Sequence, residues 1–531
     1  MAKARNRRRR ATRAKKSLTN ANAAPPPTLN SRQQAALFLF AALAVSIFLH
    51  FNSNKFPDTD VFYHFRHAVI YAGGGLFSGE FPWVPYSVIG KFSSDIWYGF
   101  HVLLIPFTWT GDPMLGMRLA GIFVTAVCMF SVYQACVRLD IKPALLWPFV
   151  LLFSSAFLLH RLTMLRPHVL SLGLNVLLLA LLAAGNIRGV FIAAFASAWL
   201  HLSLFFVPVI VLGVYAGTKL LTEKSLAWRE SLALAGGLVA GWLLRPNPLG
   251  AAKIAYVQVF QFTFEKLGGA PLEFGTELRP LTIAIYSNYL AFIILWTSSL
   301  LFLFWKLFHG HTRLPAAQRT LLWAAGILSA LFFLLSVLFA RRAFDFCSSF
   351  GTVLIALVFT HFLFQVKWVR IGSLGLFVFL ALYGVSLRDR VLAIGWDADR
   401  LAGAAKWIEA NSMPGDIVFN VRWEYFPELF FWNTKNYYTS GMDPIFQYAH
   451  EPELYIAGLS FAAPRRSFLC ATGDCAEETT SDPYQILKER FKARYVFLLK
   501  QADTNTYLYL LSDKRFSLKS EDYISAVFEV L

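Results

Sequence analysis

The sequence predicts an α-helical polytopic membrane protein with a water-soluble α/β domain at its C-terminal end. Of its 531 residues, 56% are hydrophobic and only 15% are charged, against about 25% charged residues in an ordinary globular domain. The composition then changes near Trp396, and residues 396–531 hold 19 of the 32 acidic residues. Because a water-soluble fold cannot bury so much apolar surface, we expect the earlier part of the chain to lie in lipid.

Residues 1–34 are expected to form a disordered, basic cytoplasmic tail. The first 16 residues carry nine Lys or Arg and no acid, and three consecutive prolines follow at 25–27. Such a run often binds nucleic acid, but here the apolar stretch Ala35–Phe51 follows almost at once. We therefore interpret the tail as a topogenic signal that keeps the N-terminus in the cytoplasm, with no nucleic-acid partner. No small-residue cleavage site follows the apolar stretch, so an uncleaved signal anchor is expected.

Residues 35–395 are expected to form a transmembrane domain of about 11 helices. A spanning helix needs about 20 apolar residues, and 17 can suffice. The candidate spans are 35–52, 114–137, 143–160, 168–185, 189–200, 203–218, 231–244, 288–306, 320–340, 346–364 and 371–387. Two of them, 189–200 and 203–218, are short, and the alternative is a single helix broken at His201.

The charges of the connecting loops favour eleven spans. With the N-terminus inside, every predicted cytoplasmic loop is short and basic, as the positive-inside bias requires. Merging the two short segments at His201 would invert all later loops. An odd number of spans places residues 396–531 outside the cytoplasm, and we expect the protein to reside in a bacterial inner (plasma) membrane.

The first outer loop, residues 53–113, is expected to be large. It contains a further apolar run at 96–110 that is interrupted by His101 and Pro106. We interpret this run as a helix lying at the membrane surface, and a twelfth span is the alternative.

The C-terminal domain alternates helical and strand-like stretches. Residues 401–411 and 484–492 favour helices, whereas 416–421 and 494–499 favour strands, which is typical of an α/β domain. Cys470 and Cys475 would form a disulfide if their loop lies outside the cytoplasm. The other three cysteines, which fall in apolar segments, are expected to be packing residues and are Cys128, Cys136 and Cys347.

Acidic residues gather just after the first helix. Ten of the thirteen acids between residues 35 and 395 fall in predicted outer loops, and Asp58 and Asp60 belong to the densest group. Two carboxylates at this spacing can act as a base or hold a divalent cation such as Mg²⁺ or Mn²⁺. If the segment is helical, Asp60, His64 and His67 share one face. The structural alternative is that Asp58 or Asp60 caps a helix.

This segment resembles a known family. Asp60-Val61-Phe62-Tyr63-His64-Phe65-Arg66 is similar to the acidic-aromatic-Arg motif of oligosaccharyltransferase catalytic subunits and of related transferases that use polyprenyl-phosphate sugars, all within the GT-C superfamily. The stretches Asp95-Ile96-Trp97-Tyr98-Gly99-Phe100-His101 and Gly111-Asp112-Pro113 look like the end of the first loop in GT-C enzymes. Arg422-Trp423-Glu424-Tyr425 resembles a Trp-Trp-Asp-Tyr-Gly motif that contacts the acceptor.

The resemblance implies a GT-C-like fold and assigns roles within these motifs. Asp60 and Asp58 would be catalytic. The implied substrate-binding residues are His64, Arg66, Asp95, His101, Trp423, Glu424 and Tyr425. The chain departs from the oligosaccharyltransferase pattern in the next outer loop, residues 160–168, which lacks the family's second acidic pair.

Basic residues stand where those acids were expected. Arg161, Arg166 and His168 would suit a phosphate or pyrophosphate, since arginine offers a bidentate fork to its oxygens. We expect the same of Arg341 and Arg342, with Asp345 orienting Arg341. The alternative for any one of these arginines is anchoring at lipid headgroups.

Together these features predict an inverting membrane glycosyltransferase. The donor would be a polyprenyl-phosphate- or pyrophosphate-linked sugar, and the acceptor an extracytoplasmic saccharide, lipid or protein. Membrane lipids are the remaining expected partner. The alternatives are a transporter or flippase of lipid-linked saccharides, a polysaccharide polymerase or ligase, and a non-catalytic assembly protein that keeps the GT-C scaffold.

Overall fold

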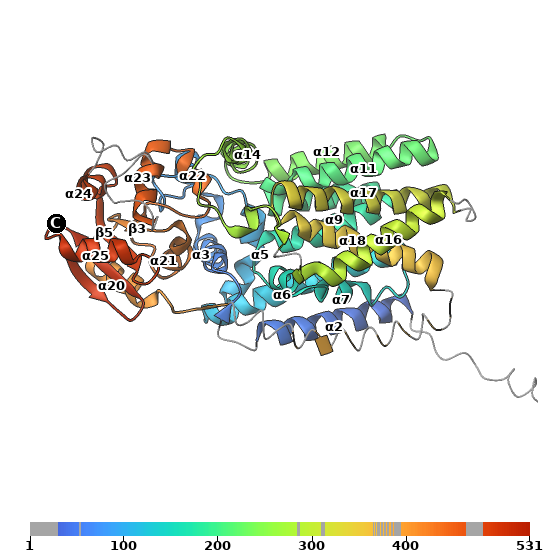
Figure 1. Cartoon of the computed structure of the whole chain (residues 1–531), viewed down its shortest axis with the longest axis horizontal. Helices are drawn as coiled ribbons and strands as arrows, with labels where there is room; N and C mark the ends of the chain where they lie inside the picture. The colour runs from blue at the N-terminus through green and yellow to red at the C-terminus, as the bar shows by residue number, and fades with distance from the viewer. Residues whose placement is uncertain are drawn as a thin grey trace, which may run out of the picture.

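The computed structural model describes residues 30–51, 55–283, 287–308, 314–364, scattered positions from 366 to 386, 395–462 and 482–531. Two parts lie end to end (Figure 1). One is a bundle of long helices that run roughly parallel, and the other is a smaller domain built around a sheet. The helices α3 (Asp60–Ala72) and α5 (Tyr98–Thr108) lie where the two parts meet.

The long helices of the bundle follow the predicted spans. Five of the described helices are long and apolar enough to cross a membrane, or six if one bent pair counts as a single span. The protein is therefore an integral membrane protein. The predicted span 371–387 lies outside the continuously described residues. The longer helices are α2 (Ser31–His50), α6 (Pro113–Arg138), α9 (Pro167–Ala183), α10 (Ile187–Leu200), α11 (Phe206–Glu223), α12 (Trp228–Leu243), α16 (Leu290–Phe308), α17 (Ala316–Leu338) and α18 (Ala343–Val358).

The predicted span 143–160 is not one continuous helix. The structure divides it into α7 (Trp147–Leu152) and α8 (Ala156–Leu162), because Ser155 begins a new helix by accepting a hydrogen bond at 3.0 Å from the Leu158 N–H. After α8 the chain turns by 104° into α9. Pro167 at the first position of α9 suits this start, since proline has no N–H to offer a preceding turn. This elbow carries Arg161 and Arg166.

The short segments on either side of His201 are separate helices, as the loop charges predicted. The backbone of His201 leaves helical geometry (φ −151°, ψ 78°), and the short 3-10 helix η2 (Leu202–Leu204) leads into α11. The helix α5 has 11 residues with Pro106 inside it and packs against α3 at the junction of the two parts. Its 11 residues are fewer than a membrane span needs, and its position at the membrane surface stays a prediction.

Shorter elements complete the membrane part and its outer loops. They are β1 (Lys55–Phe56), η1 (Gly75–Phe77), α4 (Val88–Phe92), α13 (Pro248–Tyr256), the π-helical turn η3 (Val257–Gln261), α14 (Phe262–Leu267), η4 (Thr276–Leu278), η5 (Ser287–Tyr289) and the π-helical turn η6 (Phe359–Leu363). Cys128, Cys136 and Cys347 are buried free thiols, which confirms their packing role. Cys470 and Cys475 fall outside the described residues.

The C-terminal domain contains a five-stranded mixed sheet in the order β4-β3-β5-β7-β6. β3 is parallel to both β4 and β5, whereas β7 is antiparallel to β5 and β6. The strands are β3 (Ile417–Asn420), β4 (Tyr437–Tyr438), β5 (Ala493–Leu499), β6 (Phe516–Glu521) and β7 (Ser525–Val530). The helices are α20 (Ala402–Asn411), η7 (Trp423–Tyr425), α21 (Phe426–Trp432), α22 (Pro444–Tyr448), α23 (Pro452–Ala462), α24 (Pro483–Gln485), η8 (Ile486–Arg490) and α25 (Thr504–Ser512).

The two parts are joined through the first outer loop. β1 pairs with β2 (Trp396–Asp397) at the start of the C-terminal domain. α21 packs on α3, where the rings of Phe62 and Phe431 lie 5.3 Å apart and those of Tyr63 and Phe430 lie 6.1 Å apart. Since Phe62 and Tyr63 are buried, α3 is held from both sides, and the position of its first turn is fixed.

Candidate active site

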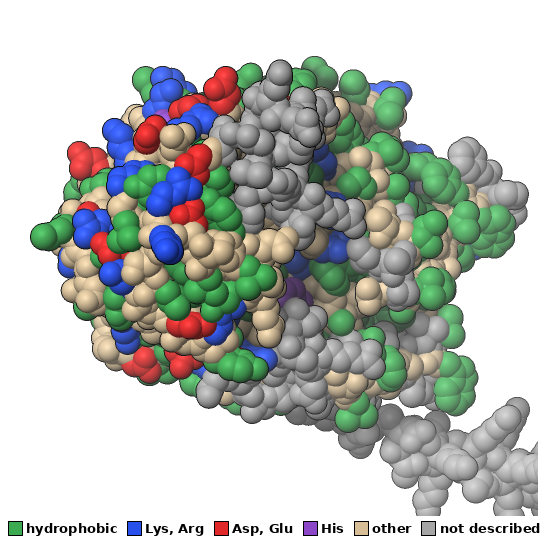
Figure 2. Space-filling model, turned by 60° about the vertical axis from the view of Figure 1, so that its left-hand side comes forward, with side chains coloured by type: hydrophobic (Ala, Val, Ile, Leu, Met, Phe, Trp, Pro, Cys, Tyr) green, Lys and Arg blue, Asp and Glu red, His purple; other side chains and the backbone are tan. Residues whose placement is uncertain are grey.

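A cavity of about 1080 Å³ opens where the helical bundle meets the C-terminal domain. Figure 2 shows a hollow at this junction in which Lys or Arg and His side chains are visible. The lining brings together most of the residues predicted from the sequence. They are Asp58, Asp60, His64, Arg161, Arg166, His168, Arg341, Arg342 and Trp423.

Arg166 lies between the two predicted catalytic acids. Its Nε and Nη2 donate to the two carboxylate oxygens of Asp58, and Nη2 lies 3.0 Å from Asp60 Oδ2. Asp60 stands in the first turn of α3, where the helix dipole favours a negative charge. Arg166 therefore takes the position that a cation shared by the two carboxylates would occupy, and the acid pair does not fit a divalent cation in this arrangement.

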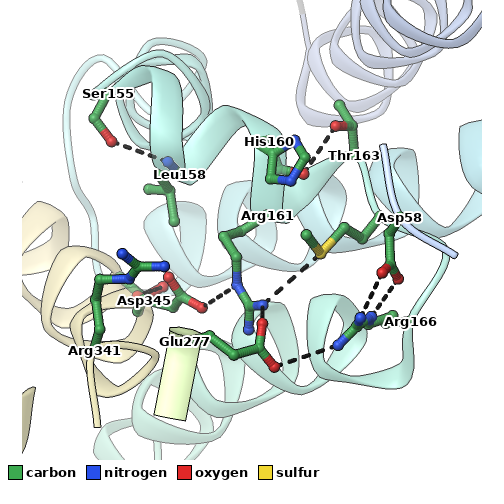
Figure 3. Close-up of polar contacts among 12 residues, drawn as sticks. Asp58, Ser155, Leu158, His160, Arg161, Thr163, Arg166, Glu277, Arg341 and Asp345 are labelled. Atoms are coloured by element: carbon green, nitrogen blue, oxygen red, sulfur yellow. Dashed lines mark hydrogen bonds and ion pairs between the residues drawn. The ribbon is translucent and has the colours of Figure 1, made fainter. Parts of the chain in front are cut away.

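Arg161 forms a second ion-pair centre (Figure 3). Its Nε donates to Asp345 Oδ2 at 2.9 Å, and its Nη1 donates to Glu277 Oε2. Glu277 also accepts from Arg166 Nη1 at 3.4 Å, so one acid links both arginines. The expectation that Asp345 orients Arg341 is wrong. The elbow between α8 and α9 brings Arg161 to Asp345 instead, and Arg341 Nη2 donates to Thr276 Oγ1 at 3.1 Å.

Three cations line the cavity without a carboxylate partner. Among the residues that the structure describes, Lys266, Arg341 and Arg342 form no ion pair. Lys266 Nζ donates to the backbone oxygens of Leu278 and Phe339, and the Arg341 guanidinium lies 4.3 Å from the centre of the Phe157 ring. We call these residues the open cations. Glu277 acts on Arg341 and Arg342 only from beyond ion-pair distance, so the guanidinium groups remain available to an anionic ligand.

Burial and charge shift the pKa values of the acids in opposite directions. Burial raises the pKa of Asp60 to about 8, and the nearby Asp58 and Glu277 add to this effect while Arg166 opposes it. Burial alone would also raise the pKa of Glu277, but the arginines, chiefly Arg161, lower it to about 2. Burial lowers the pKa of Arg342, and the negative charges of Glu277 and Asp443 offset this effect only in part.

The predicted residues His64, His101 and Asp95 form one hydrogen-bonded chain. His64 Nδ1 lies 2.8 Å from His101 Nε2, and His101 Nδ1 lies 2.6 Å from Asp95 Oδ2. Asp95 also accepts from Tyr71 Oη at 2.9 Å and from the Trp97 N–H at 2.8 Å. Of the three, His64 alone lines the cavity in the described structure, and the other two lie behind it.

Other predicted residues lie away from the cavity. Arg66 donates to Thr434 Oγ1 at 3.0 Å, and Tyr425 Oη donates to Asp503 Oδ2 at 2.8 Å. Arg66, Glu424 and Tyr425 do not line the cavity, so a ligand in the cavity would not contact them directly. Trp423 does line it, together with Trp396, and so the C-terminal domain covers the site.

Sequence reasoning missed several lining residues. Glu277 was visible only as one of many outer-loop acids, and Lys266 had no motif around it. Gln258 donates to Asp443 Oδ2 at 2.7 Å, which links η3 to the C-terminal domain. His201 was noted only as a helix break, yet it lines the cavity. The break itself was the available signal, because a polar residue between two apolar segments often faces a cavity.

The likeness of this chain to known proteins lies in its fold. No family model matches the chain, and no curated protein does. Among solved structures, ArnT from Cupriavidus metallidurans bound to undecaprenyl phosphate is 13% identical in sequence, with a TM-score of 0.53 over 94% of this chain and 99% of ArnT. ArnT in the apo state is 14% identical, with a TM-score of 0.54 over 94% and 98% of the two chains.

The chain has the same overall fold as ArnT, a bundle of membrane helices followed by a C-terminal domain. The likeness extends over both the helical bundle and the C-terminal domain, so it confirms the architecture predicted from the sequence. This fold places the elbow carrying Arg161 and Arg166 beside the first turn of α3, which is how acids and bases from distant parts of the chain meet.

Proposed function

We propose that the protein is an inverting membrane glycosyltransferase that takes a sugar from a polyprenyl-phosphate-linked donor and transfers it to an extracytoplasmic acceptor. The observation that carries the proposal is the cavity, in which an acid pair and three open cations face the same space. The likeness to ArnT, which was crystallised with undecaprenyl phosphate, supports a lipid of this class as the carrier.

The open cations are proposed to bind the phosphate of the donor. Arginine can offer two parallel N–H groups to phosphate oxygens, and lysine adds a point charge. As the bond to the sugar breaks, negative charge grows on the leaving phosphate, and fixed cations stabilise that charge in the transition state. Arg342 is well placed, because its backbone N–H donates to the Glu277 backbone oxygen at 3.0 Å and so holds it beside the ion-pair centre.

The apolar part of the cavity is proposed to take the polyprenyl chain. Phe260, Phe264 and Leu267 line it, and each residue keeps more than 40% of its surface exposed. Exposed apolar residues of a membrane protein face lipid at no cost, so a lipid tail can enter from the bilayer between these side chains.

Asp60 is proposed to polarise the acceptor. Asp60 contacts Arg166, whereas Arg342 is held at Glu277, the acid that also pairs with Arg166. Inversion would require the attacking group at Asp60 and the phosphate at the open cations to lie on opposite faces of the sugar. The Asp60 carboxylate would accept a hydrogen bond from the acceptor hydroxyl or amide. Because Arg166 occupies the space between Asp58 and Asp60, no step is assigned to a metal ion.

The test is sugar transfer by Asp60→Asn. The protein in nanodiscs is given a panel of undecaprenyl-phosphate hexoses and pentoses, with an envelope fraction as the acceptor source, and release of undecaprenyl phosphate is followed by mass spectrometry. The variant should fold normally and lose transfer by at least about 10³-fold. The matched control is Asp112→Asn, since Asp112 caps α6 outside the cavity and asparagine caps equally well. Normal transfer by Asp60→Asn would refute the proposal.

A further inference from the structure

The chain His64–His101–Asp95 runs from the cavity into the protein interior, and its hydrogen bonds fix where each proton sits. Asp95 Oδ2 accepts from both Tyr71 Oη and His101 Nδ1, and its Oδ1 accepts from the Trp97 N–H. An ionised carboxylate can only accept, so His101 must carry its proton on Nδ1. In a neutral His101, Nε2 then accepts, and the proton shared with His64 belongs to His64 Nδ1.

This assignment leaves His64 Nε2 with a free lone pair. No described residue forms a hydrogen bond with that atom, and His64 lines the cavity. His64 also stands one helical turn from Asp60 on α3, so the two side chains lie on the same face of the helix. A group held by Asp60 is therefore within reach of an unprotonated imidazole nitrogen.

Resting on the proposed transfer reaction, we propose that His64 takes the proton of the acceptor and that His101 and Asp95 form a relay that stabilises the resulting charge. The acceptor atom forms its bond to the anomeric carbon, and the carbon–oxygen bond to phosphate breaks with its electron pair staying on the phosphate. The acceptor proton goes to His64 Nε2. The Nδ1 proton of His64 then passes to His101 Nε2, which leaves the positive charge on His101 beside the Asp95 carboxylate.

The surroundings of the relay suit this role. His101 is fully buried, and burial alone would oppose a charge there. Asp95 provides the counter-charge, since His101 and His67 hold the pKa of this carboxyl well below its usual range although burial opposes them. Burial lowers the pKa of His64, and the neighbouring His101, Arg166 and His67 add to this effect, so His64 is unprotonated when the acceptor arrives.

A metal ion is a poor alternative occupant of this cluster. Ligand atoms of His67, Asp95 and His101 lie within 4.8 Å of one another. However, Asp95 Oδ2, the oxygen nearest both histidines, already accepts two hydrogen bonds, and a carboxylate oxygen has two lone pairs. Both lone pairs of Asp95 Oδ2 are therefore used by these hydrogen bonds, and neither is left for a metal ion.

The relay is tested with His64→Ala and added imidazole, using the nanodisc transfer assay described above. The variant should lose about 10²- to 10⁴-fold in single-turnover rate, as expected when a proton acceptor is removed. Imidazole, which can enter the cavity, should raise the rate of this variant by at least about tenfold, and less basic imidazoles should raise it less. His50→Gln is the control, because His50 bonds to Thr125 Oγ1 at 3.1 Å, does not line the cavity and contacts no member of the relay.

Two further variants test the positioning residues. Asp95→Asn and His101→Gln should each lower the single-turnover rate by about tenfold or more, with unchanged binding of undecaprenyl phosphate. A rate of His64→Ala within threefold of the wild type, or a loss that no imidazole rescues, would overturn the relay. If the wild type itself transfers no sugar, the proposed function fails instead, so the two failures are distinguishable.

Discussion

The cavity contains two groups of basic residues that differ in their partners. Arg161 and Arg166 are locked to four carboxylates, those of Asp58, Asp60, Glu277 and Asp345. The open cations, by contrast, form no ion pair with a described carboxylate, and the contacts of Lys266 and Arg341 are with neutral oxygens or an aromatic ring. The difference indicates that the first group stabilises the structure of the site, whereas the second is available to bind an anionic ligand.

The largest effect should come from breaking the first group. Arg161 is 4% exposed, and Arg161→Met would leave Asp345 and Glu277 facing each other without their main partner. Removing one partner of a buried ion pair costs about 3–5 kcal/mol, so the variant should be poorly folded. Thermal melting of the purified protein checks this.

The control for that prediction is Arg342→Met, which removes an open cation. Its melting temperature should equal that of the wild type, because no described carboxylate loses a partner. Equal destabilisation by the two variants would erase the distinction between the groups.

The next largest effect should be a dependence of the transfer rate on pH, which is set by the ionisation of Asp60. Transfer is proposed to need ionised Asp60, and a carboxyl with a pKa of about 8 is protonated below that value. The single-turnover rate should therefore rise about tenfold per pH unit up to pH 8 and then level off. The charged groups that act on Asp60 are Arg166, Asp58, Glu277 and Asp443. Among the carboxylates, Asp58 has the largest effect on Asp60, and it also pairs with Arg166.

Measuring the transfer rate of Asp58→Asn over the same pH range tests the assignment to Asp60. Removing the neighbouring negative charge should lower the pKa of Asp60 and move the rise in rate to lower pH. A rate that is flat with pH in the wild type would contradict the role given to Asp60.

The sequence allowed most of the fold to be predicted, because hydrophobic length and loop charge act locally. The loop charges predicted two helices on either side of His201, because a single helix there would have put the later basic loops outside the cytoplasm. The structure has two helices, at 187–200 and 206–223. The break at Ser155 was missed, because an apolar run carries no periodicity that tells one membrane helix from two short buried ones. That break mattered, since it starts α8, the short helix that leads into the elbow carrying Arg161 and Arg166.

The site was predictable where a motif lies within one element and less so where partners come from distant segments. Asp60 and His64 follow from a short stretch of α3. The partner of Asp345 did not, since Arg341 is closer in sequence but Arg161 is the residue that the fold delivers. Trp423 reached the cavity as expected, while Tyr425, two residues later, turns to Asp503. Which side of a short 3-10 turn faces a cavity is set by packing, and the sequence alone does not specify it.

The central claim is that the open cations bind a phosphate attached to a polyprenyl chain. The most direct measurement compares equilibrium binding of undecaprenyl phosphate and of uncharged undecaprenol to the protein in nanodiscs. The account predicts that undecaprenyl phosphate binds more tightly than undecaprenol. It also predicts that Arg342→Gln lowers the affinity for undecaprenyl phosphate by about 10- to 100-fold and leaves the affinity for undecaprenol unchanged. Equal affinity for the two lipids, or full phosphate affinity in Arg342→Gln, would contradict it.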